Sequence, residues 1–153
     1  MKRTLVCLVL ACCILFAGGI SFAEPLDPSL NDAVNAFLSA YKNKDADSLS
    51  NVMAAQAAQY SFRVKTGKSD VMSRQELLTW LRNISADKYS IYDAANRSME
   101  YVGGSKNIAL VKADLSAAWK GAESKAKAGF LFTKVDGKWQ LLSYSLDQWQ
   151  DSY

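Results

Sequence analysis

The sequence contains no histidine, and its three cysteines, Cys7, Cys12 and Cys13, all lie near the N-terminus. Without histidine the chain has no Ser-His or Cys-His pair for nucleophilic catalysis, and it lacks the usual ligands of zinc and non-haem iron. The cysteines sit in a segment that we expect to be removed, so the mature chain has neither a disulfide nor a thiol. We therefore expect no metal or other cofactor, and a fold that its apolar core alone stabilises.

A strong excess of charge of one sign is also missing. The chain has 18 basic and 15 acidic residues, and 16 basic residues remain once Lys2 and Arg3 are removed, which leaves a net charge of +1. Nucleic-acid-binding domains normally carry a marked basic excess. Beyond the N-terminal segment, no stretch is apolar enough to span a membrane. We therefore expect neither a nucleic-acid partner nor a membrane span in the mature chain.

The first 23 residues have the three parts of a secretory signal peptide: a basic start, an apolar run, and small residues at Ser21 and Ala23. This pattern predicts cleavage near Ala23 and export to the periplasm or the cell exterior. An uncleaved membrane anchor and lipid attachment at Cys12 are the alternatives. Residues 24–153 are long enough for one domain with its own core.

A β-hairpin around Asp136-Gly137 is the strongest local signal, because both turn residues accept a positive φ. A two-residue turn pairs Val135 with Lys138, and strict alternation then pairs Leu131 with Leu142 and Gly129 with Tyr144. This register predicts two apolar faces, both of which should be covered. One face carries Leu131, Thr133, Val135, Leu142, Tyr144 and Leu146, and the other carries Phe130, Phe132, Trp139 and Leu141.

The order of elements predicts an α+β fold. A helix with an apolar stripe from Leu30 to Tyr41 begins at Asp27, and a short helix follows Asp45 or Asp47. A strand over 59–64, a loop over 66–70 and a helix opened by a capping box at Ser73 come next. Strands over 89–102 and 107–119 precede the hairpin. We expect a curved antiparallel sheet wrapped around the N-terminal helices, which encloses a conical pocket.

These segments resemble the nuclear-transport-factor-two-like superfamily, also called SnoaL-like or cystatin-like, which includes ketosteroid isomerases, polyketide cyclases and many small secreted proteins. The resemblance lies in residues 34–49, 73–81 and 130–139, and none of these is a catalytic motif. It implies a conical pocket and, often, dimers formed sheet to sheet. The catalytic positions of the isomerase branch fall on Phe37, near Ser61 and near Gly129, and none of these side chains can act as the tyrosine, base or acid donor.

Two groups of residues are candidates for function. The pocket candidates combine apolar walls with a few polar groups, the usual pattern of a small-ligand site: Trp119, Tyr144, Thr133, Leu131, Leu142, Leu115, Trp80, Phe37, Ser61 and Arg63. Tyr144 is the most informative, because a buried phenol needs a hydrogen-bond partner. The dimer-interface candidates are Phe130, Phe132, Trp139 and Leu141; an exposed patch of such residues usually marks an interface.

We favour an exported, non-catalytic binding domain that holds an apolar or amphipathic molecule in the cone, as a homodimer. The first alternative is a lyase or isomerase that uses a single pocket aspartate as its base. Asp93 and Asp147 are the carboxylates whose facing the sequence leaves open. The second alternative is a dimeric protein-interaction module whose cone is filled by its own side chains.

Overall fold

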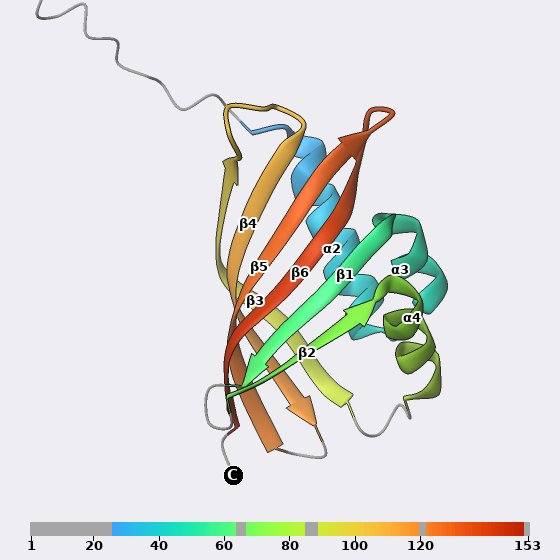
Figure 1. Cartoon of the computed structure of the whole chain (residues 1–153), viewed down its shortest axis with the longest axis vertical. Helices are drawn as coiled ribbons and strands as arrows, with labels where there is room; N and C mark the ends of the chain where they lie inside the picture. The colour runs from blue at the N-terminus through green and yellow to red at the C-terminus, as the bar shows by residue number, and fades with distance from the viewer. Residues whose placement is uncertain (1–25, 64–66, 85–88, 120–121, 152–153) are drawn as a thin grey trace, which may run out of the picture.

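A computed structural model describes residues 26–63, 67–84, 89–119 and 122–151 (Figure 1). At residues 63, 89–92, 119, 122 and 147–151 only the backbone is described. Along the chain the elements are α2 (Pro28–Lys42), α3 (Ala46–Val52), β1 (Met53–Arg63), β2 (Lys68–Ser73), α4 (Arg74–Asn83), β3 (Tyr89–Tyr101), β4 (Ile108–Trp119), β5 (Ala122–Val135) and β6 (Lys138–Asp151).

The helices begin at the residues that the sequence predicts. Asp27 caps α2, Pro28 opens its first turn, and the apolar stripe is buried along its length. Asp45 caps α3. At α4, the side chain of Ser73 accepts from the Glu76 amide while the Glu76 carboxylate accepts from the Ser73 amide, so the predicted capping box is present. These caps satisfy amide groups that a helix start leaves without partners.

The strands form one sheet in the order β2-β1-β6-β5-β4-β3. All neighbours are antiparallel except β1 and β6, which run parallel. The sheet is curved and unclosed, and α2 lies behind it in the view of Figure 1. We call the side packed on the helices the inner face and the opposite side the outer face. The α+β fold with a cone-like interior is therefore confirmed; in the described residues, no helix is long and apolar enough to cross a membrane.

Two strands differ from the sequence expectation. Lys68–Ser73 forms β2, where a loop over 66–70 was expected, and β1 begins at Met53, ahead of the strand expected over 59–64. The side chains of β2 are almost all exposed, so this edge strand lacks the alternating apolar pattern that predicts strands. Its pairing with β1, rather than its own composition, makes it a strand.

The hairpin turn is confirmed, but its register is predicted correctly only near the turn. Val135 pairs with Lys138 and Phe132 with Leu141, after which the ladder shifts and Leu131 pairs with Ser143. Leu142 is the extra residue of a β-bulge, which a strict two-residue period cannot anticipate. Phe130 therefore lies opposite Tyr144, and Gly129 lies opposite Ser145.

The bulge puts residues of both predicted faces on the inner face. The buried set on β5 and β6 is Phe130, Phe132, Trp139, Leu141, Tyr144 and Leu146. Val135, by contrast, is exposed, and Leu131 and Thr133 are only half-buried. On β4, which lies within the strand predicted over 107–119, alternate residues are buried, among them Ala109, Val111 and Leu115.

The start of α2 is fastened to the hairpin by a polar cluster. The Asp27 carboxylate accepts from Lys134 Nζ at 2.5 Å and from Trp139 Nε1 at 3.2 Å. The Asp27 amide donates to the Tyr101 hydroxyl, and the Tyr101 ring stacks on Trp139. The hydrogen bonds that the Asp27 carboxylate accepts, above all the one from Lys134, hold the pKa of Asp27 well below its usual range. This cluster joins the first described helix to β3, β5 and β6.

Candidate functional site

A layer of aromatic rings fills the described interior between α2 and the sheet. Tyr144 is fully buried and stacks on Phe130, with ring centroids 5.1 Å apart and planes 3° apart. Phe37 from α2 meets Phe130 at 5.4 Å and Tyr144 at 5.6 Å, both edge to face. Tyr41, one helical turn further along α2, lies 6.1 Å from Tyr144. Stacked and edge-to-face contacts are favourable aromatic geometries, so these rings form a closely packed aromatic layer inside the cone.

The aromatic contacts continue from this aromatic layer to α4. The ring of Trp80, which is half-buried on α4, lies 6.2 Å from that of Tyr41. Three of the predicted pocket residues, Phe37, Trp80 and Tyr144, are therefore brought together through Tyr41, which the sequence analysis placed only in a helix stripe. An i,i+4 spacing puts Phe37 and Tyr41 on the same side of α2, and this spacing could have added Tyr41 to the predicted pocket residues.

A buried polar atom lies beside the aromatic layer. Gln59 pairs with Tyr144 across the parallel β1–β6 ladder, and its exposed neighbour Tyr60 points the other way, so the Gln59 side chain is on the inner face. Its Oε1 atom is buried and has no hydrogen-bond partner among the described residues. Leaving such an acceptor unsatisfied costs about 1–3 kcal/mol. Gln59 was not among the site residues predicted from the sequence.

The other predicted pocket residues do not gather at this layer. Leu115 is buried on the inner face of β4, and Ser61 is half-buried. Leu131 and Thr133 alternate with buried Phe130 and Phe132, so they point to the outer face, and Leu142 is the bulge residue. The side chains of Trp119 and Arg63 lie outside the described residues.

The predicted dimer patch is wrong. Phe130, Phe132, Trp139 and Leu141 are at most 5% exposed within a single chain. They lie on the inner face, which the helices cover, as the contact between Phe37 and Phe130 shows; the bulge brings Tyr144 to this same face. Side chains already buried in the monomer core are not available to a second copy.

Asp93 and Asp147 are the two carboxylates whose facing the sequence leaves open. Asp93 is exposed and alternates with buried Ala94, so it lies on the outer face; its Oδ1 accepts from the Ala94 amide at 2.9 Å. Asp93 is therefore not placed to act as a base inside the cone. The side chain of Asp147 lies outside the described residues.

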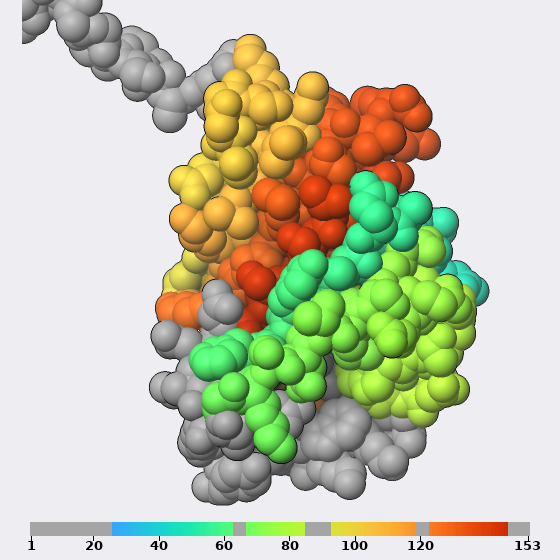
Figure 2. Space-filling model, viewed as in Figure 1, coloured from blue at the N-terminus to red at the C-terminus, as the bar shows by residue number. Residues whose placement is uncertain are grey.

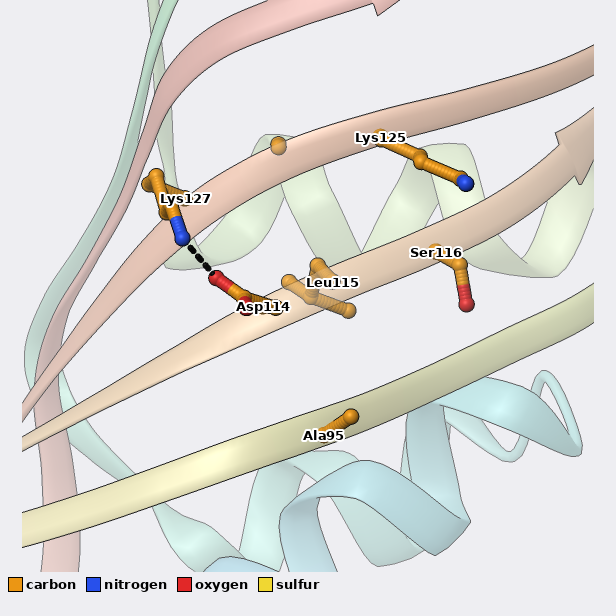
Figure 3. A pocket seen from close by; sticks show the side chains of 7 residues that line it. Ala95, Asp114, Leu115, Ser116, Lys125 and Lys127 are labelled. Carbon is orange, nitrogen blue, oxygen red and sulfur yellow. Dashed lines mark hydrogen bonds and ion pairs between the residues drawn. The ribbon is translucent and has the colours of Figure 1, made fainter.

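Two adjoining hollows of about 400 and 480 Å³ share Asp114 and Lys127. The first, which lies over β3, β4 and β5, is drawn in Figure 3. Asp114 pairs with Lys127 and also accepts from Asn96 Nδ2 at 2.8 Å. The hydrogen bond from Asn96, followed by that from Lys127, lowers the pKa of Asp114. Asp114 alternates with the buried Ala113 and Leu115 on β4, so it points away from the cone interior, and these hollows belong to the outer face.

A backbone irregularity positions the Asn96 side chain. The β3–β4 ladder shifts between Ala95 and Ser98, and Asn96 takes a φ of 51°. Asparagine adopts this left-handed conformation more readily than most residues. The next side chain, Arg97, donates to Asn35 of α2 at 2.6 Å. The bulge thus sends one residue to Asp114 and the next to the helix.

Comparisons with known proteins agree on the architecture. The family model of the SnoaL-like domain matches residues 30–146. A protein of unknown function with a cystatin-like fold from Nostoc punctiforme PCC 73102 is 14% identical, with a TM-score of 0.61 over 83% of this chain and 96% of that chain. An NTF2-like protein from Cytophaga hutchinsonii ATCC 33406 is 11% identical, with a TM-score of 0.60 over 77% and 93%.

At such identities the structural likeness concerns the fold alone. A search of curated protein sequences gives no match. The family model, however, covers most of the chain and includes α2, the bulged hairpin and the strands between them. The chain therefore belongs to the family of SnoaL-like domains.

Proposed function

We propose that the mature chain is an exported, non-catalytic binding domain that holds an apolar or amphipathic molecule in its cone. The SnoaL-like fold supports a small-molecule binding or isomerase-type domain. The ligand's apolar body packs against Tyr41, Trp80 and Tyr144, and a hydroxyl or amine of the ligand donates to Gln59 Oε1. Trp119 and Arg63 complete the site in this proposal.

The observation that carries the proposal is the unsatisfied Gln59 acceptor. Buried polar groups in folded proteins are nearly always hydrogen-bonded, and an exception needs a reason. Gln59 Oε1 lies on the inner face, where Tyr144, its partner on the β6 ladder, contacts Phe37 and Tyr41. A ligand donor in that position would remove the cost of the unpaired oxygen. An apolar site with few, convergent polar groups is the usual form of a small-molecule pocket.

A pair of shape-matched probes tests this proposal. 2-Naphthol has a hydroxyl donor where 2-methylnaphthalene has a methyl group, so only 2-naphthol satisfies Gln59. We expect 2-naphthol to bind roughly 5- to 150-fold more tightly in a titration followed by tryptophan fluorescence, since a satisfied buried acceptor contributes about 1–3 kcal/mol. Gln59→Leu should remove the difference between the probes.

Gln56→Leu is the matched control, because Gln56 is on the same strand and exposed. It should retain the preference for 2-naphthol. Equal binding of the two probes to the unaltered protein would refute the role of Gln59. Absence of binding by either probe would refute the cone as a binding site.

A filled cone is the second candidate function, that of a dimeric interaction module. The specific observation in its favour is the packing of Tyr144, Phe37 and Phe130, which are among the largest fully buried side chains. The isomerase-type alternative would require Asp147 as its base, since Asp93 faces outward. The probe titration separates the filled cone from the binding domain.

We also propose that the homodimer forms through the outer face of β1 and β2. Tyr60, Phe62 and Val71 are 48%, 42% and 62% exposed. Tyr60 pairs directly with Val71, and Phe62 follows two residues along, so the three side chains share one face. In Figure 2, β1 and β2 form a continuous strip of surface. Clusters of exposed apolar side chains commonly mark interfaces.

Export is proposed from the N-terminal pattern alone. Cleavage between Ala23 and Glu24 would leave only Glu24, Pro25 and Leu26 ahead of the Asp27 cap. The mass of the protein recovered from the periplasm of a Gram-negative host should correspond to residues 24–153. A mass that includes residues 1–23 would support the anchor, and a diacylglyceryl mass at Cys12 would support lipid attachment; either would refute simple cleavage.

A further inference from the structure

The inner face of β1 carries a second polar side chain beyond Gln59. Gln59 and Ser61 are two residues apart on this strand, and they alternate with Tyr60 and Phe62, which are exposed on the outer face. The two polar side chains therefore point to the same side of the sheet. At about 3.3 Å per strand residue, their Cα atoms are roughly 7 Å apart.

The ladders on both sides of β1 agree with this placement. On β6, Gln59 pairs with Tyr144 and Ser61 with Leu146, and both of these partners are buried on the inner face. On β2, Ser61 pairs with Asp70, whose side chain is exposed. Gln59 thus belongs to the row of the sheet that carries the aromatic layer. Ser61 belongs to the next row, toward the turn that joins β1 to β2.

These two polar groups differ in depth, and both are available to a ligand. Gln59 Oε1 is buried and has no hydrogen-bond partner among the described residues. Ser61 is half-buried, and in the described part of the chain its hydroxyl forms no hydrogen bond. A serine hydroxyl can both donate and accept. The strand therefore presents a deep acceptor and, in line with it, a more accessible hydroxyl.

Charged side chains of both signs lie close to Ser61. Asp70 is its direct cross-strand neighbour, and the carboxylate disfavours an anionic group of a ligand at this position. Lys68, which pairs with Arg63, alternates with Asp70 on the same face of β2 and is one row further from the aromatic layer. An ion of either sign would therefore meet a like charge near Ser61, whereas an uncharged hydroxyl would not.

We infer that the ligand of the cone is an uncharged molecule with a hydroxyl group at each end, one donating to Gln59 Oε1 and the other hydrogen-bonded to Ser61. This inference rests on the proposed cone site, and it adds Ser61 as the residue that selects ligands by the spacing of their polar groups. The apolar body between the two hydroxyls lies beside Tyr144 and Leu146, the β6 partners of the two residues.

The probe is 2,6-dihydroxynaphthalene, which has its hydroxyls at opposite ends of a rigid apolar body. Its counterparts are 6-methyl-2-naphthol, in which a methyl group replaces one hydroxyl, and 2,3-dihydroxynaphthalene, in which both hydroxyls are at one end. Binding to the full mature protein is measured by calorimetry at neutral pH. We expect the 2,6-diol to bind roughly 2- to 12-fold more tightly than either counterpart, the usual contribution of one additional neutral hydrogen bond.

Two serine variants assign the additional hydrogen bond. Ser61→Ala removes only the hydroxyl, so it should abolish the preference for the 2,6-diol and leave the affinity for 6-methyl-2-naphthol unchanged. Ser69→Ala is the matched control, because Ser69 is exposed and pairs with Phe62 on the outer face. This control variant should keep the preference.

The outcomes separate this inference from the proposed function on which it rests. If 6-methyl-2-naphthol binds as tightly as the 2,6-diol, the inference is overturned while the cone remains a binding site. A preference for the 2,6-diol that persists in Ser61→Ala would also overturn it. Absence of binding by all three probes would overturn both the inference and the proposed cone site.

Discussion

At the scale of single residues, Phe37 is the side chain on which the interior packing converges. It contacts Phe130, Tyr144 and Tyr41, and its own side chain is fully buried. Its removal deletes a large apolar volume from a site where neighbours on both α2 and the sheet are already fixed. The loss should therefore leave a cavity that the surroundings fill only in part.

Phe37→Ala should lower the free energy of unfolding by about 3–5 kcal/mol, the usual cost of deleting a buried aromatic ring. The measurement is urea denaturation of the mature protein. Val102→Ala, at an exposed position beside the β3–β4 turn, should change stability by no more than about 0.5 kcal/mol. A similar small loss at Phe37 would contradict the described packing.

Asp27 gives a pH-dependent prediction. Its pKa is lowered by the Lys134 hydrogen bond, so the folded-state value lies below the unfolded value of about 3.9. The ionised carboxylate thus stabilises the fold above that pH, and the contribution is lost as the pH falls further. Asp27→Asn keeps a capping side chain but removes the charge.

The melting temperature of Asp27→Asn should therefore be lower than that of the unaltered protein at pH 7, and the gap should shrink below about pH 4. Lys134→Met in the Asp27→Asn background should add less than it does alone, because the two residues act as a pair. A gap that stays constant from pH 7 to pH 2 would show that charge at Asp27 has no part in stability.

At the scale of elements, the capping box makes α4 a well-defined unit that presents Trp80 to Tyr41. Ser73→Ala removes the acceptor for the Glu76 amide and should cost about 1 kcal/mol in urea denaturation. Glu76→Gln is the control, since glutamine also completes a capping box. If Ser73→Ala lost no stability, the cap would have no stabilising part; equal losses in both variants would show that the charge of Glu76 contributes as much as the cap.

The elements also show what a single sequence can and cannot predict. Caps and turns are local, so Asp27, Ser73 and the Asp136-Gly137 turn are predicted correctly. The Leu142 bulge is not local, because burying both Leu141 and Tyr144 against the helices requires one extra residue in β6. The predicted interface residues are core residues because the helices cover their face, and the bulge adds Tyr144 to that face. β2 was missed because its partner, not its pattern, makes it a strand.

At the scale of the whole molecule, the candidate sites depend on contacts between distant segments. Trp80 and Tyr144 are 64 positions apart in sequence, and Tyr41 on α2 links them. Gln59 was not predicted because its unsatisfied oxygen is a property of the packed interior. Likewise, the pairing of Asp114 with Lys127 follows from strand register rather than composition.

The proposed dimer gives a prediction at this scale. Tyr60→Ser combined with Val71→Ser removes the exposed apolar cluster of β1 and β2 and should convert the protein to a monomer in light-scattering measurements. Val135→Ser at the hairpin tip is the control, because Val135 is 43% exposed but stands apart from the cluster. A dimer that survives the double substitution would place the interface elsewhere, and a monomeric parent protein would refute the dimer.

Native mass spectrometry of the mature protein, purified without detergent, tests the central claim most directly, since it weighs the folded chain together with anything that it retains. A binding domain should carry an additional small-molecule mass that is released on denaturation. Gln59→Leu should lose this mass, and Gln56→Leu should keep it. A spectrum that contains only the bare polypeptide mass, for the parent protein and both variants, would contradict the account and favour the filled cone.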